Sequence, residues 1–265
     1  MKTADRVLVL MYHRVGALND ASEARYCITP QHFAEQLHAL AARGYRAVPV
    51  DALVRWLEGG PALAEGDFVL TFDDGFRGVR EHALPVLQAL GWPCTIFLVT
   101  DRLGGVDGWD RKGREGAPTY PLLDANEIAD MRRRGCSFHS HTRSHASLTA
   151  LDDAALAREL AGSRATLETL VGDGDRYLAY PYGHVDDRVE AATRAAGYRM
   201  AFSVQPGFNR RGVNPFRLRR LDVFGTDSAA QLLRKMHLGS NDGSVGAALR
   251  YYAGRLAGRL GGGGA

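Results

Sequence analysis

Two acidic residues stand side by side in the stretch VLTFDDGFRG, where Asp73 and Asp74 follow an apolar run and precede Gly75. Adjacent carboxylates repel each other, and a bound cation would relieve that repulsion. A second group, HTRSH, places His141 and His145 four residues apart. Two imidazoles and one carboxylate suit a catalytic Zn²⁺, which keeps a further position open for water. One aspartate would bind the metal, and the other would be the base that takes the proton of that water.

Two more groups could belong to the same site: YPYG at residues 180–183, and His13. Each group has an ordinary structural alternative, because Asp and Gly favour turns, histidine pairs occur on helix surfaces, and YPYG alone suits a turn. All of them, however, stand where predicted strands end. This shared position favours a catalytic site over unrelated turns.

Short apolar runs alternate with segments of helical periodicity along most of the chain. Strands are predicted over residues 6–12, 45–50, 67–72, 94–100, 136–140, 177–183, 198–204 and 216–224. Such alternation predicts a parallel sheet with covering helices, in which the chemistry collects at the carboxyl ends of the strands. Residues 101–121 are rich in glycine and charge without periodicity, which predicts a long surface loop.

Helix start signals support the alternation. Thr29 is the predicted N-cap of a helix with Pro30 at its first position, and Asp51 is the predicted N-cap of the next helix. Asp124 and Glu127 have the spacing of a capping box.

Composition and charge narrow the function classes. The 265 residues carry a net charge of +3, with Lys and Arg scattered among acidic residues, so nucleic acid is not an expected partner. Three cysteines are too few for a disulfide framework and favour a reduced compartment. The apolar run at residues 7–11 is too short for a signal peptide, and no run suits a membrane span. We therefore expect a cytoplasmic protein.

The chain is predicted to form one catalytic domain over residues 1–240, followed at 241–265 by a C-terminal helix and a flexible Gly-rich tail. Apolar residues recur with helical spacing over 245–260, with three arginines between them. This pattern suits packing against the barrel, which we favour, and it also suits peripheral contact with a membrane surface.

The motifs TFDDG, SHTRSH and YPYG, in this order, resemble those of the polysaccharide deacetylases, the carbohydrate esterase family with the NodB homology domain. VLMYHRV and RRRGCSFHSHTRSHASL are similar to the branch of that family with a YHRV motif, and the resemblance covers about residues 5–225. It implies a distorted (β/α) barrel of seven to eight strands, similar to a TIM barrel. It also implies a divalent metal, by default Zn²⁺, with Co²⁺, Mn²⁺ or Ni²⁺ as alternatives.

The resemblance also implies roles for individual residues. Asp73 corresponds to the general base. Asp74, His141 and His145 correspond to the metal ligands. The backbone N–H of Tyr182 would help to hold the oxyanion, in a loop that Tyr180 and Pro181 shape as substrate-binding residues.

Two positions depart from the family pattern. Many members hold the base with an arginine where this chain has Ala179, and Arg220 is the expected substitute, with Arg219 as its rival. Since side chains alternate along a strand, only one of the two can face the site. The general acid is usually a histidine near the C-terminus, which would be His237. The branch resemblance assigns this role to His13, which we prefer because it ends a strand on the catalytic side.

Three other residues are less specific. Trp109 and Asp110 in the long loop could cover a sugar ring. His139 is most simply explained as a core histidine.

The resemblance implies a metal-dependent hydrolase that removes an N-acetyl, or an N-formyl, group from an amino sugar of a polysaccharide or glycoconjugate precursor. One alternative is an O-acetyl esterase that uses the same site. Another is a catalytically silent carbohydrate-binding barrel, against which the intact acid pair and histidine pair argue.

Overall fold

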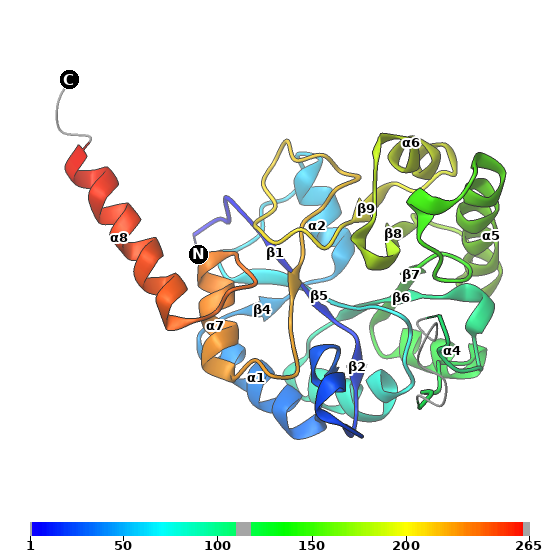
Figure 1. Ribbon diagram of the computed structural model, residues 1–265, viewed down its shortest axis with the longest axis horizontal. Helices are drawn as coiled ribbons and strands as arrows, with labels where there is room; N and C mark the ends of the chain where they lie inside the picture. Colours follow the sequence, from blue (N-terminus) through cyan, green and yellow to red (C-terminus); the bar gives the residue numbers. More distant parts are fainter. Residues whose placement is uncertain (1, 110–117, 262–265) are drawn as a thin grey trace.

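The computed structural model describes the backbone of residues 2–109 and 118–261, and the side chains of these ranges up to residue 253. Within these residues, eight parallel strands form one sheet that curls into an incomplete barrel, with helices on its outside (Figure 1). The order of neighbours is β10-β1-β5-β6-β7-β8-β9, and β4 pairs with the start of β5. The predicted distorted (β/α) barrel of seven to eight strands is confirmed.

The strands are short and lie within the predicted apolar runs. They are β1 (Leu8–Tyr12), β4 (Arg46–Ala47), β5 (Asp67–Phe72), β6 (Cys94–Leu98), β7 (Cys136–Ser140), β8 (Tyr177–Ala179), β9 (Met200–Phe202) and β10 (Leu221–Asp222). The strand predicted over 45–50 is wrong beyond Ala47, because Pro49 is the N-cap of a helix that begins at Val50. The strand predicted over 216–224 is also too long. Its backbone changes neighbour, since Leu218 pairs with Ala201 and the N–H of Val223 donates to Met11.

In the described ranges, seven α-helices surround the sheet, and an eighth extends from it (Figure 1). They are α1 (Pro30–Ala42), α2 (Val50–Leu57), α3 (Leu84–Leu90), α4 (Ala125–Arg133), α5 (Asp153–Val171), α6 (Asp187–Ala195), α7 (Ala229–Leu238) and α8 (Val245–Gly261). Within the described ranges, none of them is long and apolar enough to cross a membrane.

The helix caps follow the sequence signals in two cases of three. Thr29 accepts a hydrogen bond from the N–H of His32, and the capping box of Asp124 and Glu127 is complete. The cap predicted at Asp51 is wrong. The N-cap is Pro49, two residues earlier, and Asp51 lies in the first turn, where it accepts a hydrogen bond of 2.7 Å from the hydroxyl of Tyr177.

A short excursion between β1 and α1 was not predicted. β2 (Arg14–Val15) pairs with β3 (Cys27–Ile28), and the 3₁₀ turn η1 (Ala21–Arg25) lies between them. This excursion rises at the carboxyl end of β1, beside the site described below.

Alternation along the strands divides the core into two parts. On β5, Phe68, Leu70 and Phe72 face the helices, whereas Val69 belongs to the cluster inside the barrel. Continuing the inner series of Val69 by two and four residues leads through Thr71 to Asp73. The same alternation therefore carries an aspartate to the mouth of the barrel.

Candidate active site

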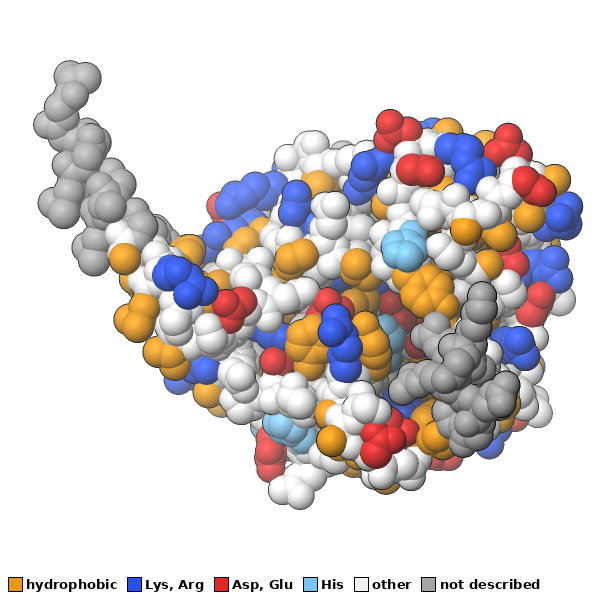
Figure 2. Space-filling view, in the orientation of Figure 1, with side chains coloured by type: hydrophobic (Ala, Val, Ile, Leu, Met, Phe, Trp, Pro, Cys, Tyr) orange, Lys and Arg blue, Asp and Glu red, His pale blue; other side chains and the backbone are white. Residues whose placement is uncertain are grey.

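The predicted catalytic residues meet at the carboxyl end of the barrel. His13 follows β1, the acid pair follows β5, and the two histidines of HTRSH follow β7. They line a cleft of about 540 Å³. The face shown in Figure 2 is hollowed near its centre, where histidine and acidic side chains are visible.

Asp73 forms a bidentate ion pair with Arg220. The two guanidinium nitrogens lie 2.6 and 2.8 Å from the two carboxylate oxygens, and both side chains are buried. Burial alone would raise the pKa of Asp73, but the guanidinium outweighs this and lowers it to about 2. Arg219 points away, donating to the carbonyl of Pro206. Of the two rivals, Arg220 is therefore the one that contacts Asp73.

Replacing Arg220 with Met in metal-free protein should lower the free energy of unfolding at pH 7 by about 3–5 kcal/mol, because it leaves a buried carboxylate uncompensated.

In the parent, the depressed pKa of Asp73 stabilises the fold above pH 4. That contribution, about 2 kcal/mol, is lost as the pH falls towards 2. Urea unfolding across this range checks both expectations. Arg219→Met is the matched control and should change stability by less than about 0.5 kcal/mol. Equal effects of the two variants would contradict the structural role given to the pair.

Asp74, His141 and His145 form a buried cluster whose ligand atoms all lie within 4.8 Å of one another. Oδ1 of Asp74 is 3.3 Å from Nε2 of His145 and 3.5 Å from Nε2 of His141. These distances match the edge of a tetrahedron, about 3.4 Å, with ligand bonds of about 2.1 Å as in zinc sites. Nδ1 of His141 lies 2.8 Å from the carbonyl oxygen of Ala179, which directs Nε2 towards the cluster. These residues therefore fit a divalent metal.

The turns that present these groups are strained. Among the described residues, four that are not glycine have positive φ angles, and all four lie at the site: Asp74 (73°), Thr142 (66°), His145 (65°) and Tyr182 (58°). Such conformations cost about 1–3 kcal/mol each and concentrate at functional sites. Gly75 also has a positive φ, 81°, and a Cβ there would lie 2.7 Å from a methyl carbon of Leu98. The glycine after the acid pair thus permits the turn and the close packing behind it.

Glu159 on α5 holds the loop that carries the histidine pair. Its carboxylate accepts hydrogen bonds from the N–H groups of Arg143 and Ser144, at 2.9 and 3.0 Å. It also accepts a bond of 2.7 Å from the Ser144 hydroxyl. We did not predict this role from the sequence, because Glu159 is one of several acidic residues on an ordinary amphipathic helix. Only the folded arrangement brings it under the loop.

His13 lines the cleft, whereas His237 lies on α7 and lines a different cavity. The ring of His13 packs at 4.8 Å from that of Tyr26, which is half exposed. Burial lowers the pKa of His13 to about 4. His139 is buried inside the barrel, where its ring packs against Tyr177 and Phe97, as expected for a core histidine.

Aromatic rings surround the cluster of Asp74, His141 and His145. Trp109 stacks on His145 with ring centres 4.6 Å apart, and Tyr182 meets the same imidazole edge-on at 4.7 Å. Tyr180 and Pro181 are buried beneath the loop, so they shape it rather than present a broad surface. Asp110, the other loop residue considered for sugar contact, lies outside the described residues.

Three polar residues that contact one another, Arg14, Glu23 and Tyr120, line one side of the cleft. This group, called the polar clasp below, was not predicted from the sequence. Arg14 forms an ion pair of 2.6 Å with Glu23 and lies 3.5 Å from the ring centre of Tyr120. The hydroxyl of Tyr120 also donates to Glu23. The clasp therefore joins the excursion after β1 to the long loop after β6. The only available signal was the place of Arg14 directly after His13.

The family profile described as polysaccharide deacetylase matches residues 62–201. This range contains the acid pair, the histidine pair and YPYG, and it spans more than half of the chain. The protein therefore belongs to the polysaccharide deacetylase family.

Individual relatives agree with this assignment. The chain is 25% identical over 236 residues to the poly-beta-1,6-N-acetyl-D-glucosamine N-deacetylase of Staphylococcus epidermidis, covering 82% of this chain and 78% of the relative. The solved structure of IcaB from Ammonifex degensii aligns with a TM-score of 0.68 and 28% identity, over 83% of this chain and 92% of that one. The Streptococcus pyogenes deacetylase PplD, solved in complex with acetate, aligns with a TM-score of 0.75 at 21% identity. That alignment covers 87% of this chain and 98% of PplD, and it shows a shared fold.

Proposed function

We propose that this protein is a metal-dependent hydrolase that removes the acetyl group from an N-acetylated amino sugar in a polysaccharide or glycoconjugate precursor. The observation that carries the proposal is the Asp74, His141 and His145 cluster beside a carboxylate, Asp73, that an arginine keeps ionised. The name of the Staphylococcus epidermidis relative supports the choice of an N-acetyl group on a sugar.

Each side chain has a place in this reaction. A bound divalent metal, by default zinc, would lower the pKa of a water molecule and polarise the amide carbonyl. Asp73 would accept the proton of the attacking water, since one of its oxygens lies 3.9 Å from Nε2 of the ligand His141. The N–H of Tyr182, turned by its positive φ, would donate to the oxygen on which negative charge develops.

His13 would protonate the leaving amine. Because burial lowers its pKa to about 4, the ring is neutral in the free protein at pH 7. We propose that it takes up a proton as negative charge develops on the substrate beside it, since a nearby negative charge raises the pKa of an imidazole. Trp109 and Tyr26, which flank the site on different segments, would contact the sugar rings.

Acetate release tests the proposal. The substrates are N-acetylated sugars ranging from a free hexosamine, through nucleotide- and lipid-linked forms, to short oligomers, with O-acetylated sugars assayed in parallel. Each is incubated with metal-loaded and with chelator-treated protein. We expect metal-dependent release from an N-acetylated sugar. Release from O-acetylated sugars alone would show an esterase, and no release by metal-loaded protein from any substrate would reject deacetylation.

A second prediction separates the two candidates for the general acid, His13 and His237. His13→Ala should lower the turnover number about 10²–10⁴-fold, the range typical of a general acid, while metal content stays unchanged. His237→Ala is the control, because its imidazole is bonded to Tyr252 outside the cleft, and it should keep parental turnover. A large loss in His237→Ala with little change in His13→Ala would reverse the assignment.

A further inference from the structure

The helix α8 projects from the body of the protein instead of covering the sheet (Figure 1). Contact with α7 is made in the first half of α8, where the Tyr252 hydroxyl and Nε2 of His237 are 3.0 Å apart. The ring of Tyr251 packs edge-on against the same histidine at 5.7 Å.

The described part of α8 exposes an apolar stripe. Val245, Leu249 and Tyr252 are 61%, 65% and 51% exposed, and their spacing places them on one face of the helix. Figure 2 shows apolar side chains along the outer edge of this helix. The other large apolar side chains that are exposed in the described ranges are single residues elsewhere: Leu18, Tyr26, Val106 and Tyr182. The stripe on α8 is therefore an unusual feature of this surface.

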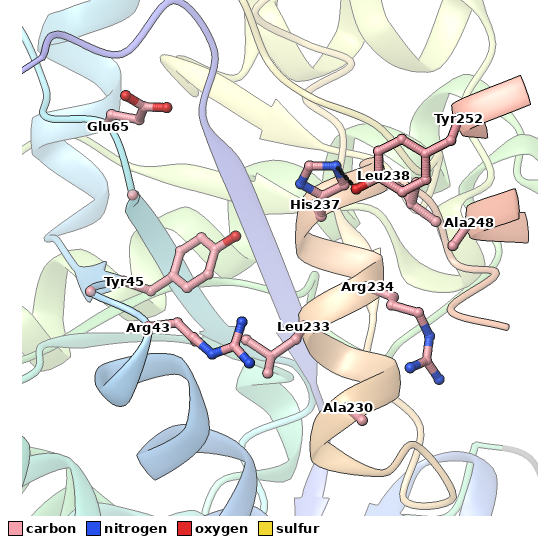
Figure 3. Close-up of a pocket in the computed structure, with 12 residues that line it drawn as sticks. Arg43, Tyr45, Glu65, Ala230, Leu233, Arg234, His237, Leu238, Ala248 and Tyr252 are labelled. Carbon is pink, nitrogen blue, oxygen red and sulfur yellow. Dashed lines mark hydrogen bonds between the residues drawn. The ribbon is translucent and has the colours of Figure 1, made fainter. Parts of the chain in front are cut away.

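Positive charge lies beside the apolar stripe. From residue 243 to the end, the sequence has three arginines and no acidic residue. Beside α8 lies a cavity of about 710 Å³, which is lined by Arg43 at the end of α1 and by Arg234 on α7 (Figure 3). Among the described residues, neither arginine has a carboxylate within ion-pair distance. The acidic groups nearby are Glu65, which lines the cavity, and Asp242, which pairs with Arg250 at 3.2 Å.

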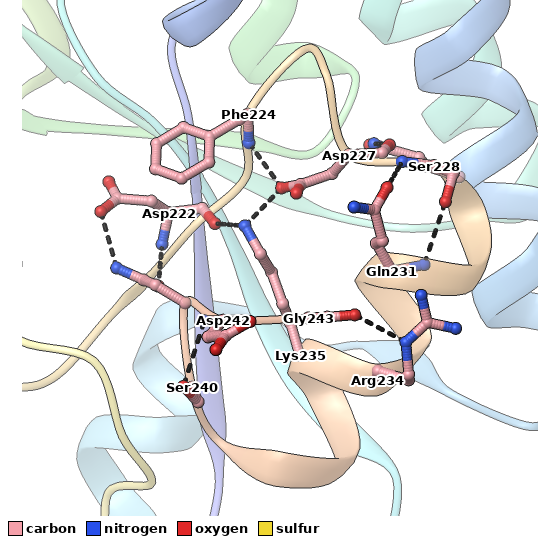
Figure 4. A network of polar contacts seen from close by, with 12 residues as sticks. Asp222, Phe224, Asp227, Ser228, Gln231, Arg234, Lys235, Ser240, Asp242 and Gly243 are labelled. Carbon is pink, nitrogen blue, oxygen red and sulfur yellow. Dashed lines mark hydrogen bonds and ion pairs between the residues drawn. The ribbon is translucent and has the colours of Figure 1, made fainter. Parts of the chain in front are cut away.

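A buried network fixes the base of α8 to the barrel. Lys235 on α7 forms an ion pair with Asp227, and its ammonium group donates to the carbonyl of Asp222 at 3.0 Å (Figure 4). Asn241, just before α8, makes two hydrogen bonds to Asp222, of 2.8 and 2.9 Å. The orientation of the start of α8 relative to the sheet is therefore set by side chains that follow β10.

We propose that this surface, defined by the apolar stripe of Val245, Leu249 and Tyr252 on α8 with Arg43 and Arg234 beside it, docks on a bilayer that contains anionic phospholipid. Apolar residues flanked by arginines and tyrosines suit the boundary between headgroups and acyl chains. A second copy of the chain is disfavoured as the occupant, because its arginines would meet those of the first. Anionic headgroups neutralise them instead.

Docking in this way would leave the catalytic cleft accessible. The cavity beside α8 includes Gly44 and Gly66, which precede β4 and β5, so it lies at the amino end of the barrel. The cleft lies at the carboxyl end. A docked protein would thus present its cleft away from the lipid surface. This inference does not depend on the proposed function.

Sedimentation with vesicles tests the inference with the full chain. Vesicles of phosphatidylcholine alone are compared with vesicles that also contain phosphatidylglycerol, at low and high salt. We expect binding to the anionic vesicles that weakens with salt, and a loss of at least tenfold in the double variant Val245→Glu with Leu249→Glu. Arg158→Glu, an exposed change on α5, alters the net charge by the same amount and should keep parental binding.

Three outcomes would overturn the inference. They are no binding to anionic vesicles at low salt, equal loss in the double variant and in Arg158→Glu, and a dimer in light scattering that the double variant dissociates. The last would identify a second copy as the occupant. Unchanged thermal unfolding of the double variant excludes misfolding as the cause of any loss.

Discussion

Replacing Asp73 with Asn should lower the turnover of an N-acetylated substrate by about 10²–10⁴-fold, the range expected when a general base is removed. The amide of Asn has nearly the shape of the carboxylate, but it cannot accept a proton from water near neutral pH. In the parent, Arg220 lowers the pKa of Asp73 to about 2, so the carboxylate is ionised near neutral pH and can act as the proposed base. The measurement is the initial rate of acetate release by protein with full metal content.

The control for this prediction must separate chemistry from folding, because Asp73→Asn also leaves Arg220 with a weaker partner. Asp222→Asn is suitable, since Asp222 lines the same cleft but belongs to neither the ion pair nor the metal cluster. Burial raises the pKa of Asp222, so the loss of its charge should be tolerated. We expect Asp222→Asn to retain most of the turnover. If Asp73→Asn retained more than a tenth of the parental turnover, the base would have to be another group.

The site could be predicted largely because its parts lie at strand ends. Hydrophobic alternation along β5 and β7 indicates which residues leave the barrel, and the resemblance of the motifs to those of the polysaccharide deacetylases predicts which of them are the metal ligands. Alternation also limits the arginine partner to one of two neighbours. It could not choose between Arg219 and Arg220, because β10 is too short to display its inward and outward faces in the sequence.

The supporting residues could not be predicted, because their roles depend on contacts distant in the sequence. Glu159 lies 15 residues beyond Ser144, and Tyr120 lies 97 residues beyond Glu23. Nothing local distinguishes these side chains from exposed ones. The same limit applies to Asp51, whose residue type suits an N-cap while the fold uses it to bind the hydroxyl of Tyr177.

The excursion after β1 could not be predicted for a similar reason. Its strands, β2 and β3, are two residues long, which is too short to give a periodic pattern. It nevertheless supplies one wall of the cleft, including Tyr26 beside His13. The loop after β6 contributes another part of the wall, through Trp109 and Tyr120. We infer that substrate selection depends on these two segments more than on the barrel itself.

Removing a single metal ligand should have the largest effect on metal content. We expect Asp74→Ala and His145→Ala each to weaken metal affinity by more than the 10–100-fold typical of losing an outer-shell partner, so that purified protein no longer holds one ion per chain. The reason is geometric, because Oδ1 of Asp74 lies 3.3 and 3.5 Å from the two imidazole nitrogens and completes the triad. Without it, two histidines remain. Elemental analysis, followed by titration with Zn²⁺, Co²⁺, Mn²⁺ and Ni²⁺, gives both the occupancy and the order of affinity.

His13→Ala is the matched control for this experiment, since it removes an imidazole from the same cleft without touching the triad. It should keep one ion per chain while losing turnover, whereas the ligand variants should lose both. Added metal should then restore activity to chelator-treated parent and to neither ligand variant at the same concentration. Full occupancy in Asp74→Ala would mean that the ion is held elsewhere. In that case the short distances between Asp74 and the histidines would reflect a hydrogen-bonded cluster instead of a metal site.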